Sequence, residues 1–231
     1  MEAGKVMSHL EKIKDLYNTK IEISEDIPNE MPKNTVDTSG LHPFSEEYLQ
    51  AKTYGFQNEF HLKNAYNEAG MYTFVSLRWI VPFAKWIGER KVMEVMAGRG
   101  FLSKALREQG ITVHASDNFS WPVRTWSETV TDVIKMDALE AVEKHGKEYD
   151  ILIMGWPYMD DTAYRIIKRL YEVNPRALVV YIGEPSGGCT ADELFFEHFD
   201  MIVDEKFIEA AMYYQSWEAI HDGLYLGRYK K

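Results

Sequence analysis

The residues best suited to chemistry begin with a glycine-containing turn at residues 96–100. An apolar run, Val92–Val95, leads directly into Gly98 and Gly100, and an amphipathic helical pattern follows. Glycine lets a backbone approach a ligand closely, and the first turn of a helix offers amide groups without intrahelical partners. The stretch therefore predicts a strand, a ligand-binding turn and a helix, although the same glycines would also suit tight packing without a ligand.

Acidic side chains follow the next two apolar runs. Asp117, with Asn118 beside it, follows residues 111–115, and Asp137 follows residues 133–136. A carboxylate after the second strand of a nucleotide-binding α/β unit accepts hydrogen bonds from ribose hydroxyls. A carboxylate after the third could meet an adenine amine. Both aspartates could instead cap helices, because Asp is favoured at the N-cap.

Two more loops are expected at the same edge of the sheet, where open α/β sheets bind their ligands. The run at 151–154 ends in Gly155, Trp156, Pro157 and Tyr158, and the run at 177–182 leads into a glycine-rich loop that contains Glu184. The aromatic side chains predict a substrate wall, with covering of the sheet edge as the plainer alternative. The candidate proton acceptors are Tyr158, Asp160 and Glu184.

The elements that position these residues can be predicted from the pattern of apolar residues along the chain. Five apolar runs alternate with helical patterns after residue 90, which predicts βαβ units, a parallel sheet and right-handed crossovers. Near the C-terminus the runs at 201–203, 211–214 and 224–229 have no comparable helix between them, which predicts an antiparallel hairpin at the sheet edge.

The first ninety residues read as a helical extension. Residues 2–19 carry apolar side chains at helical spacing, and prolines and asparagines mark residues 22–44 as a connecting loop. Ser45 is the expected N-cap of a second helix, and further helix is expected from Tyr72 to Trp86. The predicted divisions are an extension or lid at residues 1–89 and a main domain at residues 90–231.

Taken together, these segments resemble the class I S-adenosylmethionine-dependent methyltransferases over roughly residues 90–230. The resemblance implies an α/β fold with a Rossmann-like, seven-stranded, mostly parallel sheet, an antiparallel C-terminal edge hairpin and a preceding helical extension. It implies S-adenosylmethionine as cofactor and places the methionine and ribose portions near Glu94, Ala97, Gly98 and Gly100. Asp117 and Asn118 would meet the ribose, Asp137 and Ala138 the adenine, and Gly155 and Trp156 the transferring methyl.

Two positions depart from the methyltransferase pattern, and two others bear on a competing cofactor. Met96 stands where the first glycine of the turn is usual, and Gly155 replaces the Asn or Asp with which amine methyltransferases hold their target nitrogen. For the competing reading, a nicotinamide dinucleotide site, Ser103 replaces the third glycine or alanine, and Glu94 would repel the pyrophosphate. Ser103 and Glu94 favour the methyl donor over the dinucleotide, and Gly155 favours oxygen over nitrogen as the methyl acceptor.

The composition of the chain limits its possible partners, its metal sites and its cellular location. The chain has 231 residues, 45% of them apolar, a net charge of -10 and the single cysteine Cys189. The negative charge disfavours nucleic acid as a partner, and the lone cysteine excludes an internal disulfide and a Cys-based zinc cage. The histidines have no metal-ligand spacing, so no metal is expected. The longest apolar stretch, residues 72–88, is interrupted by charges and a proline, so we expect no membrane span and a cytoplasmic protein.

The expected reaction is an in-line displacement in which the acceptor attacks the sulfonium methyl group, with alignment and exclusion of water as the main contributions of the protein. A carboxylate acceptor needs no base, whereas a hydroxyl or ammonium group does. A small molecule or a peptide is the expected substrate. The alternatives are an N-methyltransferase acting on nucleic acid or protein, and a noncatalytic binding module with the same fold. The sequence does not fix the oligomeric state.

Overall fold

The computed structural model describes residues 11, 15, 18–32, 36–121 and 128–231, so most of the helix expected at residues 2–19 lies outside the described residues. Backbone contacts divide the chain into two compact units. Unit 1 comprises Met1–Ser24 and Pro32–Ala69, and unit 2 comprises Glu25–Met31 and Gly70–Lys231. The helix before the first strand and a short N-terminal segment therefore belong to the same unit as the sheet.

Unit 1 is built around the helix α2, Glu46–Glu68. The side chain of Ser45 accepts a hydrogen bond from the backbone N–H of Tyr48 at 3.2 Å, which confirms the predicted N-cap. Glu46 and Glu47 lie in the first turn, where carboxylates suit the helix dipole. The described parts of residues 22–44 form neither helix nor strand, as predicted for a connecting loop.

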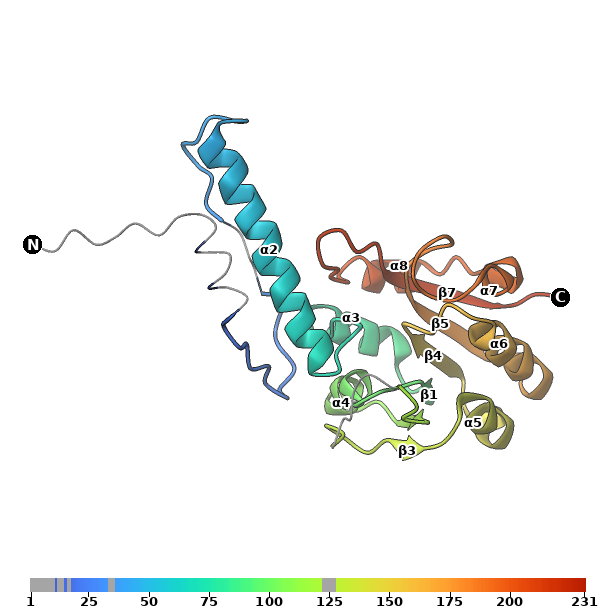
Figure 1. Cartoon of the computed structure of the whole chain (residues 1–231). Coiled ribbons are helices and arrows are strands. Elements are labelled where there is room, and N and C mark those ends of the chain that lie inside the picture. The colour runs from blue at the N-terminus through green and yellow to red at the C-terminus, as the bar shows by residue number, and fades with distance from the viewer. Residues whose placement is uncertain (1–10, 12–14, 16–17, 33–35, 122–127) are drawn as a thin grey trace, which may run out of the picture. The chain divides into compact units, whose positions relative to one another are not determined.

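Unit 2 contains a seven-stranded sheet in the order β3-β2-β1-β4-β5-β7-β6 (Figure 1). The strands are β1 Val92–Val95, β2 Val113–Asp117, β3 Ile134–Lys135, β4 Ile151–Gly155, β5 Leu178–Gly183, β6 Phe199–Met201 and β7 Gly223–Tyr229. The pairs from β3 to β5 are parallel, whereas β7 is antiparallel to both β5 and β6. Val95 is in register with Ser116 and Met154, so the carboxyl ends of β1, β2 and β4 are level.

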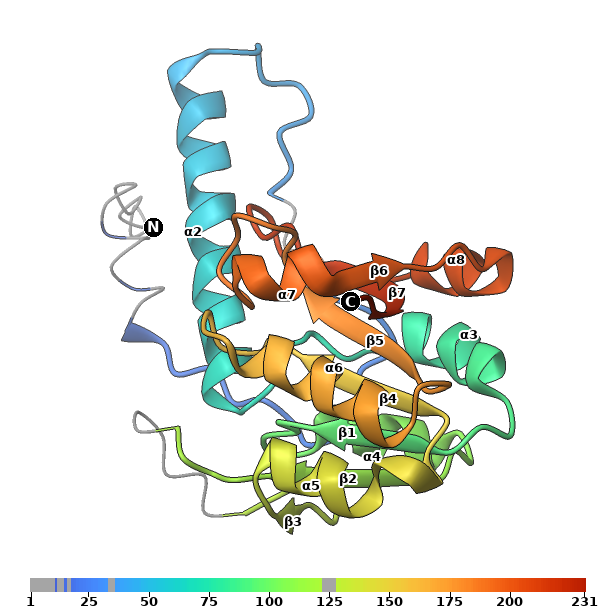
Figure 2. The same cartoon turned by 90° about the vertical axis from the view of Figure 1, so that its right-hand side faces the viewer.

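Helices cover both faces of this sheet (Figure 2). One face carries α5 Ala138–His145, followed by the short 3₁₀ helix η1 Gly146–Glu148, then α6 Thr162–Val173 and α7 Glu193–His198. The other face carries α3 Leu77–Ile87, α4 Phe101–Glu108 and α8 Glu205–Ala211. Met93, Leu152 and Val179 pack into the α5–α6 core. Since side chains alternate along a strand, Glu94 faces the opposite layer, that of α3 and α4.

The predicted start of the helix before β1 was wrong. The helix expected from Tyr72 begins at Leu77, because the first-turn amides of Leu77 and Arg78 donate to the carbonyls of Pro28 and Asn29, both at 2.8 Å. The indole of Trp79 donates to the carbonyl of Phe74 at 2.9 Å, which fixes the extended segment before the helix.

The C-terminal region also differs from the prediction. The antiparallel edge is confirmed, but α8 stands between β6 and β7, and the apolar run at 211–214 is not a strand. Asp204 caps α8 by accepting the backbone N–H of Phe207 at 2.9 Å, and Phe207 packs edge-on against Trp86 of α3. Burial of this ring against α3 explains why the segment folds as a helix.

Gly100 is expected to be the most sensitive glycine of the β1–α4 turn. Its φ is +86°, and a Cβ added there would lie 2.7 Å from Cγ2 of Val133 and 2.9 Å from Cγ2 of Thr131. Gly110 has a similar φ, +82°, with no heavy atom within 4 Å of an added Cβ. Gly110→Ala should cost about 1–2 kcal/mol of unfolding free energy, the cost of the left-handed conformation alone.

Gly100→Ala should cost about 1–3 kcal/mol more than Gly110→Ala, because the methyl group must also displace packed side chains. Urea unfolding of both variants measures the difference. Equal losses would show that the turn is not held against Thr131 and Val133.

Candidate functional site

The glycine turn and Asp117 meet at the carboxyl ends of β1 and β2. The backbone N–H of Gly98 donates to Oδ2 of Asp117 at 2.8 Å, and the N–H of Phe119 donates to Oδ1 at 2.6 Å. The backbone N–H of Ala97 donates to the carbonyl of Ser116 at 3.0 Å. One half-buried carboxylate thus fixes both the turn after β1 and the loop after β2.

The turn itself is built from unusual backbone conformations. Gly98 has φ +55° and Gly100 φ +86°, and Gly100 precedes the first residue of α4. Met96, which stands where a glycine is usual, also lies in the left-handed region at φ +56°. Its side chain packs against the core beneath the α5 and α6 helices. Such a conformation costs about 1–2 kcal/mol for a residue with a Cβ, and we infer that this packing offsets the cost.

Glu94 lies beneath the turn, in the layer of α3 and α4. Its side chain is buried, with 4% exposure, and its Oε2 accepts a hydrogen bond from the hydroxyl of Ser103 in α4. Burial raises the pKa of Glu94 to about 7, opposed by the Ser103 bond and the charge of Arg107 and assisted by the charge of Asp117. Glu94 therefore changes its charge near neutral pH.

The residues after β2 and β3 make local bonds. Oδ1 of Asp137 accepts the backbone N–H groups of Leu139 at 2.9 Å and Glu140 at 3.4 Å, so this residue is the N-cap of α5. Ala138 is buried in the first turn of that helix. Asn118 is exposed and accepts the N–H of Ser120 at 2.9 Å. Asp137 therefore caps a helix, which is the alternative role that the sequence left open. Its contact with an adenine remains a prediction.

The turn after β4 is held by a residue that the sequence did not single out. Trp156 has φ +49°, and its indole N–H donates to Oδ2 of Asp222 at 2.9 Å. Tyr214 donates to the same oxygen at 2.6 Å, and the hydroxyl of Ser216 donates to Oδ1. Asp222 immediately precedes β7, far from Trp156 along the chain, and no local pattern linked the two.

Gly155 lies against another residue that the sequence analysis missed. A Cβ at Gly155 would stand 3.0 Å from Oγ1 of Thr73, in the segment before α3. An Asn or Asp side chain at this position would therefore have to displace Thr73. The turn after β4 therefore leaves little room for the amine-holding side chain of the related pattern unless Thr73 moves.

An aromatic cluster stands beside the turn after β4. The rings of Trp121 and Tyr158 are stacked, with centroids 5.2 Å apart and an interplanar angle of 16°. Tyr72 meets Trp121 edge-on at 6.4 Å. Burial raises the pKa of Tyr158; the charges of Asp117 and Asp160 add to the rise, and a hydrogen bond with Ser120 opposes it. Trp121 follows Asp117 by only four residues, a signal that the sequence analysis did not use.

The remaining candidate proton acceptors are already bonded. Oε2 of Glu184 accepts the N–H of Cys189 at 2.7 Å, and Oε1 accepts the N–H of His221 at 3.2 Å. Desolvation raises the pKa of Glu184, but these backbone bonds outweigh it, so the pKa lies below its ordinary value. Asp160 is exposed, and its Oδ1 accepts the N–H of Thr162 at 2.9 Å.

Arg99, inside the glycine turn, is tied to the N-terminal segment of unit 2. Its guanidinium forms an ion pair with Glu25 and donates to the carbonyl of Glu128 at 2.8 Å. A Cβ at Gly70 would lie 2.8 Å from Cδ of Arg99, so the arginine stem packs directly on Gly70. These contacts fix the side chain of Arg99 against Glu25 and Gly70, so Arg99 helps to position the glycine turn.

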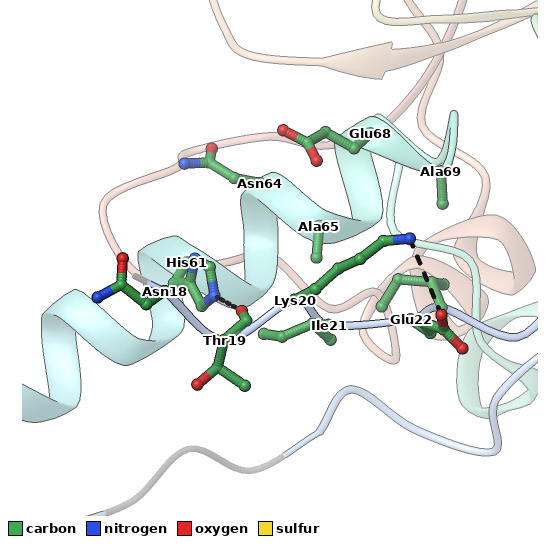
Figure 3. Close-up of a pocket in the computed structure, with 11 residues that line it drawn as sticks. Asn18, Thr19, Lys20, Ile21, Glu22, His61, Asn64, Ala65, Glu68 and Ala69 are labelled. Carbon is green, nitrogen blue, oxygen red and sulfur yellow. Dashed lines mark hydrogen bonds and ion pairs between the residues drawn. The ribbon is translucent and has the colours of Figure 1, made fainter. Parts of the chain in front are cut away.

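Unit 1 contains a cavity of about 690 Å³ between α2 and the segment at residues 18–23 (Figure 3). Nε2 of His61 lies 2.9 Å from the carbonyl of Thr19, and Lys20 pairs with Glu22 at 3.8 Å. None of the site residues predicted from the sequence lines this cavity. Its lining consists of Asn18, Thr19, Lys20, Ile21, Glu22, Ile23, His61, Asn64, Ala65, Glu68 and Ala69.

The described residues contain neither a candidate cluster of metal ligands nor a helix that could span a membrane. No group of three or more histidine, cysteine or acidic side chains in these ranges could hold a metal ion. None of the helices in the described part combines the length and apolar character needed to cross a bilayer.

Comparison with known proteins gives similarities of fold. No model of a protein family matches the sequence, and no curated protein matches it. A magnesium protoporphyrin IX methyltransferase from Synechocystis is 12% identical, with a TM-score of 0.45 over 76% of this chain and 84% of that chain. A 1,6-didemethyltoxoflavin-N1-methyltransferase from Burkholderia thailandensis is 16% identical, with a TM-score of 0.45 over 85% and 98%. Human N-acetylserotonin methyltransferase is 12% identical, with a TM-score of 0.44 over 96% and 67%.

The sheet of this chain defines the class of fold on its own. Five parallel strands in the order β3-β2-β1-β4-β5 are followed by β7, which is antiparallel, and by β6 at the edge. This is the Rossmann-like architecture of the class I methyltransferases, as the sequence predicted.

Proposed function

We propose that the chain binds S-adenosylmethionine at the carboxyl ends of β1 and β2 and transfers its methyl group to a small molecule. The observation that carries this proposal is the 2.8 Å bond between the Gly98 amide and Asp117, which joins turn and carboxylate in one site. An ionised carboxylate has about four acceptor positions, and the amides of Gly98 and Phe119 use two. Two are left for the two hydroxyls of a ribose.

The proposed roles follow from these positions. The cofactor would supply an electrophilic methyl group on a sulfonium. Asp117, with Asn118 beside it, would hold the ribose, and the backbone of Ala97–Gly100 would approach the methionine portion. Asp137 and Ala138 would flank the adenine, and Gly155 and Trp156 would face the methyl group. Asp222 would orient Trp156 through the 2.9 Å bond to its indole N–H.

We propose an oxygen acceptor, and specifically a carboxylate, because Glu184 and Tyr158, two of the predicted proton acceptors, are poorly suited to remove a proton. Both oxygens of Glu184 accept backbone amides, and its lowered pKa makes it a weak base. The raised pKa of Tyr158 keeps its hydroxyl protonated at neutral pH. A carboxylate attacks without losing a proton, so the protein only has to align it and exclude water.

The charge of the chain supports a small-molecule acceptor over nucleic acid. A net charge of -10 opposes the phosphate contacts on which nucleic-acid affinity depends.

We propose that the protein is located in the reducing cytoplasm. Its sole cysteine, Cys189, is exposed and unpaired with another cysteine, which suits that location.

Isothermal titration tests the proposed cofactor. We expect S-adenosylmethionine and its demethylated product, S-adenosylhomocysteine, to bind with dissociation constants on the order of 1–100 μM. The oxidised nicotinamide dinucleotide serves as the control, because it shares the adenosine but adds a pyrophosphate, and it should give no heat. Binding of the dinucleotide without either sulfur compound would contradict the proposal.

A further inference from the structure

The aromatic cluster ends at the side chain of Tyr158, which is partly exposed. Tyr72 contacts the edge of Trp121, Trp121 stacks on Tyr158, and Tyr158 remains 37% exposed. The negative charge of Asp117 is near enough to raise the pKa of Tyr158. The free end of the stack therefore lies close to the residue proposed to hold the cofactor.

Ring packing positions Trp121. Its Nε1 is buried and has no hydrogen-bond partner in the part of the chain that the structure describes. Trp156 differs, because Asp222 holds its indole N–H at 2.9 Å. The position of the Trp121 ring is therefore set by its ring contacts, and its flat surface stacks on the ring of Tyr158.

The hydroxyl of Tyr158 is not suited to proton removal near neutral pH, because burial and the neighbouring carboxylates keep it protonated. The useful part of this side chain is thus its ring, which stacks on Trp121 while the residue as a whole remains 37% exposed.

From this geometry we infer that the methyl acceptor is a flat, conjugated molecule that stacks on the ring of Tyr158, on the side away from Trp121. The inference rests on the proposed function, since it assigns the acceptor to the site beside the cofactor. Planar rings gain from contact with an aromatic face beyond the area they bury, whereas puckered rings gain only the buried area. Tyr158 is then a specificity-determining residue and Trp121 its positioning residue.

The test uses naphthoate and its fully saturated counterpart, decalin carboxylate, as probes of equal charge. Each is titrated into the protein saturated with S-adenosylhomocysteine, and also into the protein alone. We expect naphthoate to bind about tenfold more tightly than decalin carboxylate, as for stacking of a base on an aromatic side chain. Tyr158→Phe keeps the ring and should keep the preference, whereas Tyr158→Leu should reduce it to about twofold or less.

Tyr213→Leu is the matched control, because Tyr213 is 50% exposed and lies outside the stack, and it should leave the preference unchanged. Equal binding of the two probes, absence of binding at about 1 mM, or a preference that survives Tyr158→Leu would overturn the inference. If S-adenosylhomocysteine binds and any of these results is found, the inference of a flat acceptor is wrong, but the proposed cofactor is still supported. If S-adenosylhomocysteine fails to bind, the proposed function is wrong whatever the probes do.

Discussion

Replacing Asp117 with alanine is expected to weaken the binding of S-adenosylhomocysteine by at least about 100-fold. The variant would lose two hydrogen bonds from the ribose to a charged group, each worth about 1.5–3 kcal/mol. It would also leave the amides of Gly98 and Phe119 without the partners that now fix the turn and the following loop. Isothermal titration of the variant measures the loss.

Asp204→Ala makes the same chemical change away from the site. Asp204 caps α8 through the N–H of Phe207 at 2.9 Å, so its removal should cost about 1 kcal/mol of stability and leave the affinity unchanged. Circular dichroism of both variants checks that they are folded. An affinity of Asp117→Ala within about threefold of that of the unchanged chain would remove this carboxylate from the site.

The second large effect is a pH dependence of stability caused by Glu94. The pKa of this carboxyl is raised from 4.5 to about 7 in the folded state, so the folded chain binds the proton more tightly than the unfolded chain. The resulting stabilisation is complete below about pH 4.5 and is lost as the pH rises through about 7. A shift of this size corresponds to about 3 kcal/mol.

Comparison with Glu94→Gln isolates this contribution, because glutamine does not titrate. The stability of the unchanged chain relative to the variant should fall by about 3 kcal/mol between about pH 4 and pH 9 in urea unfolding. Ser103→Ala removes the bond that lowers the pKa of Glu94, so in that variant the loss should extend to higher pH. Parallel profiles for the unchanged chain and Glu94→Gln would mean that Glu94 ionises normally.

The sheet was predictable because its central strands are buried on both faces. Residues 151–154 read as a short, continuous apolar run and Val92–Val95 as one interrupted only by Glu94, and both strands lie within one residue of those bounds. The turn at Gly98 and its meeting with Asp117 followed from the same pattern, because parallel strands end at a common edge. Ser45 and Asp137 were predictable as helix caps because their partners lie within three residues.

Features that depend on distant contacts were not predictable. Asp222 meets Trp156 across 66 residues of sequence, and Thr73 reaches Gly155 from a segment that the sequence assigned to a helix. The helix α8 was missed although Asp204 followed by Glu205 is a typical helix start, since apolar residues near its end suggested a strand. In each case, contacts between residues that are far apart in the sequence determined a structure that the local pattern did not specify.

The most direct test of the central claim is a crystal structure of the chain with S-adenosylhomocysteine. We predict that the ribose hydroxyls lie within about 3 Å of the Asp117 carboxylate, with the homocysteine portion against the backbone of Ala97–Gly100. Density for the ligand elsewhere, or a side chain filling the space between Asp117 and that turn in the complex, would contradict the account.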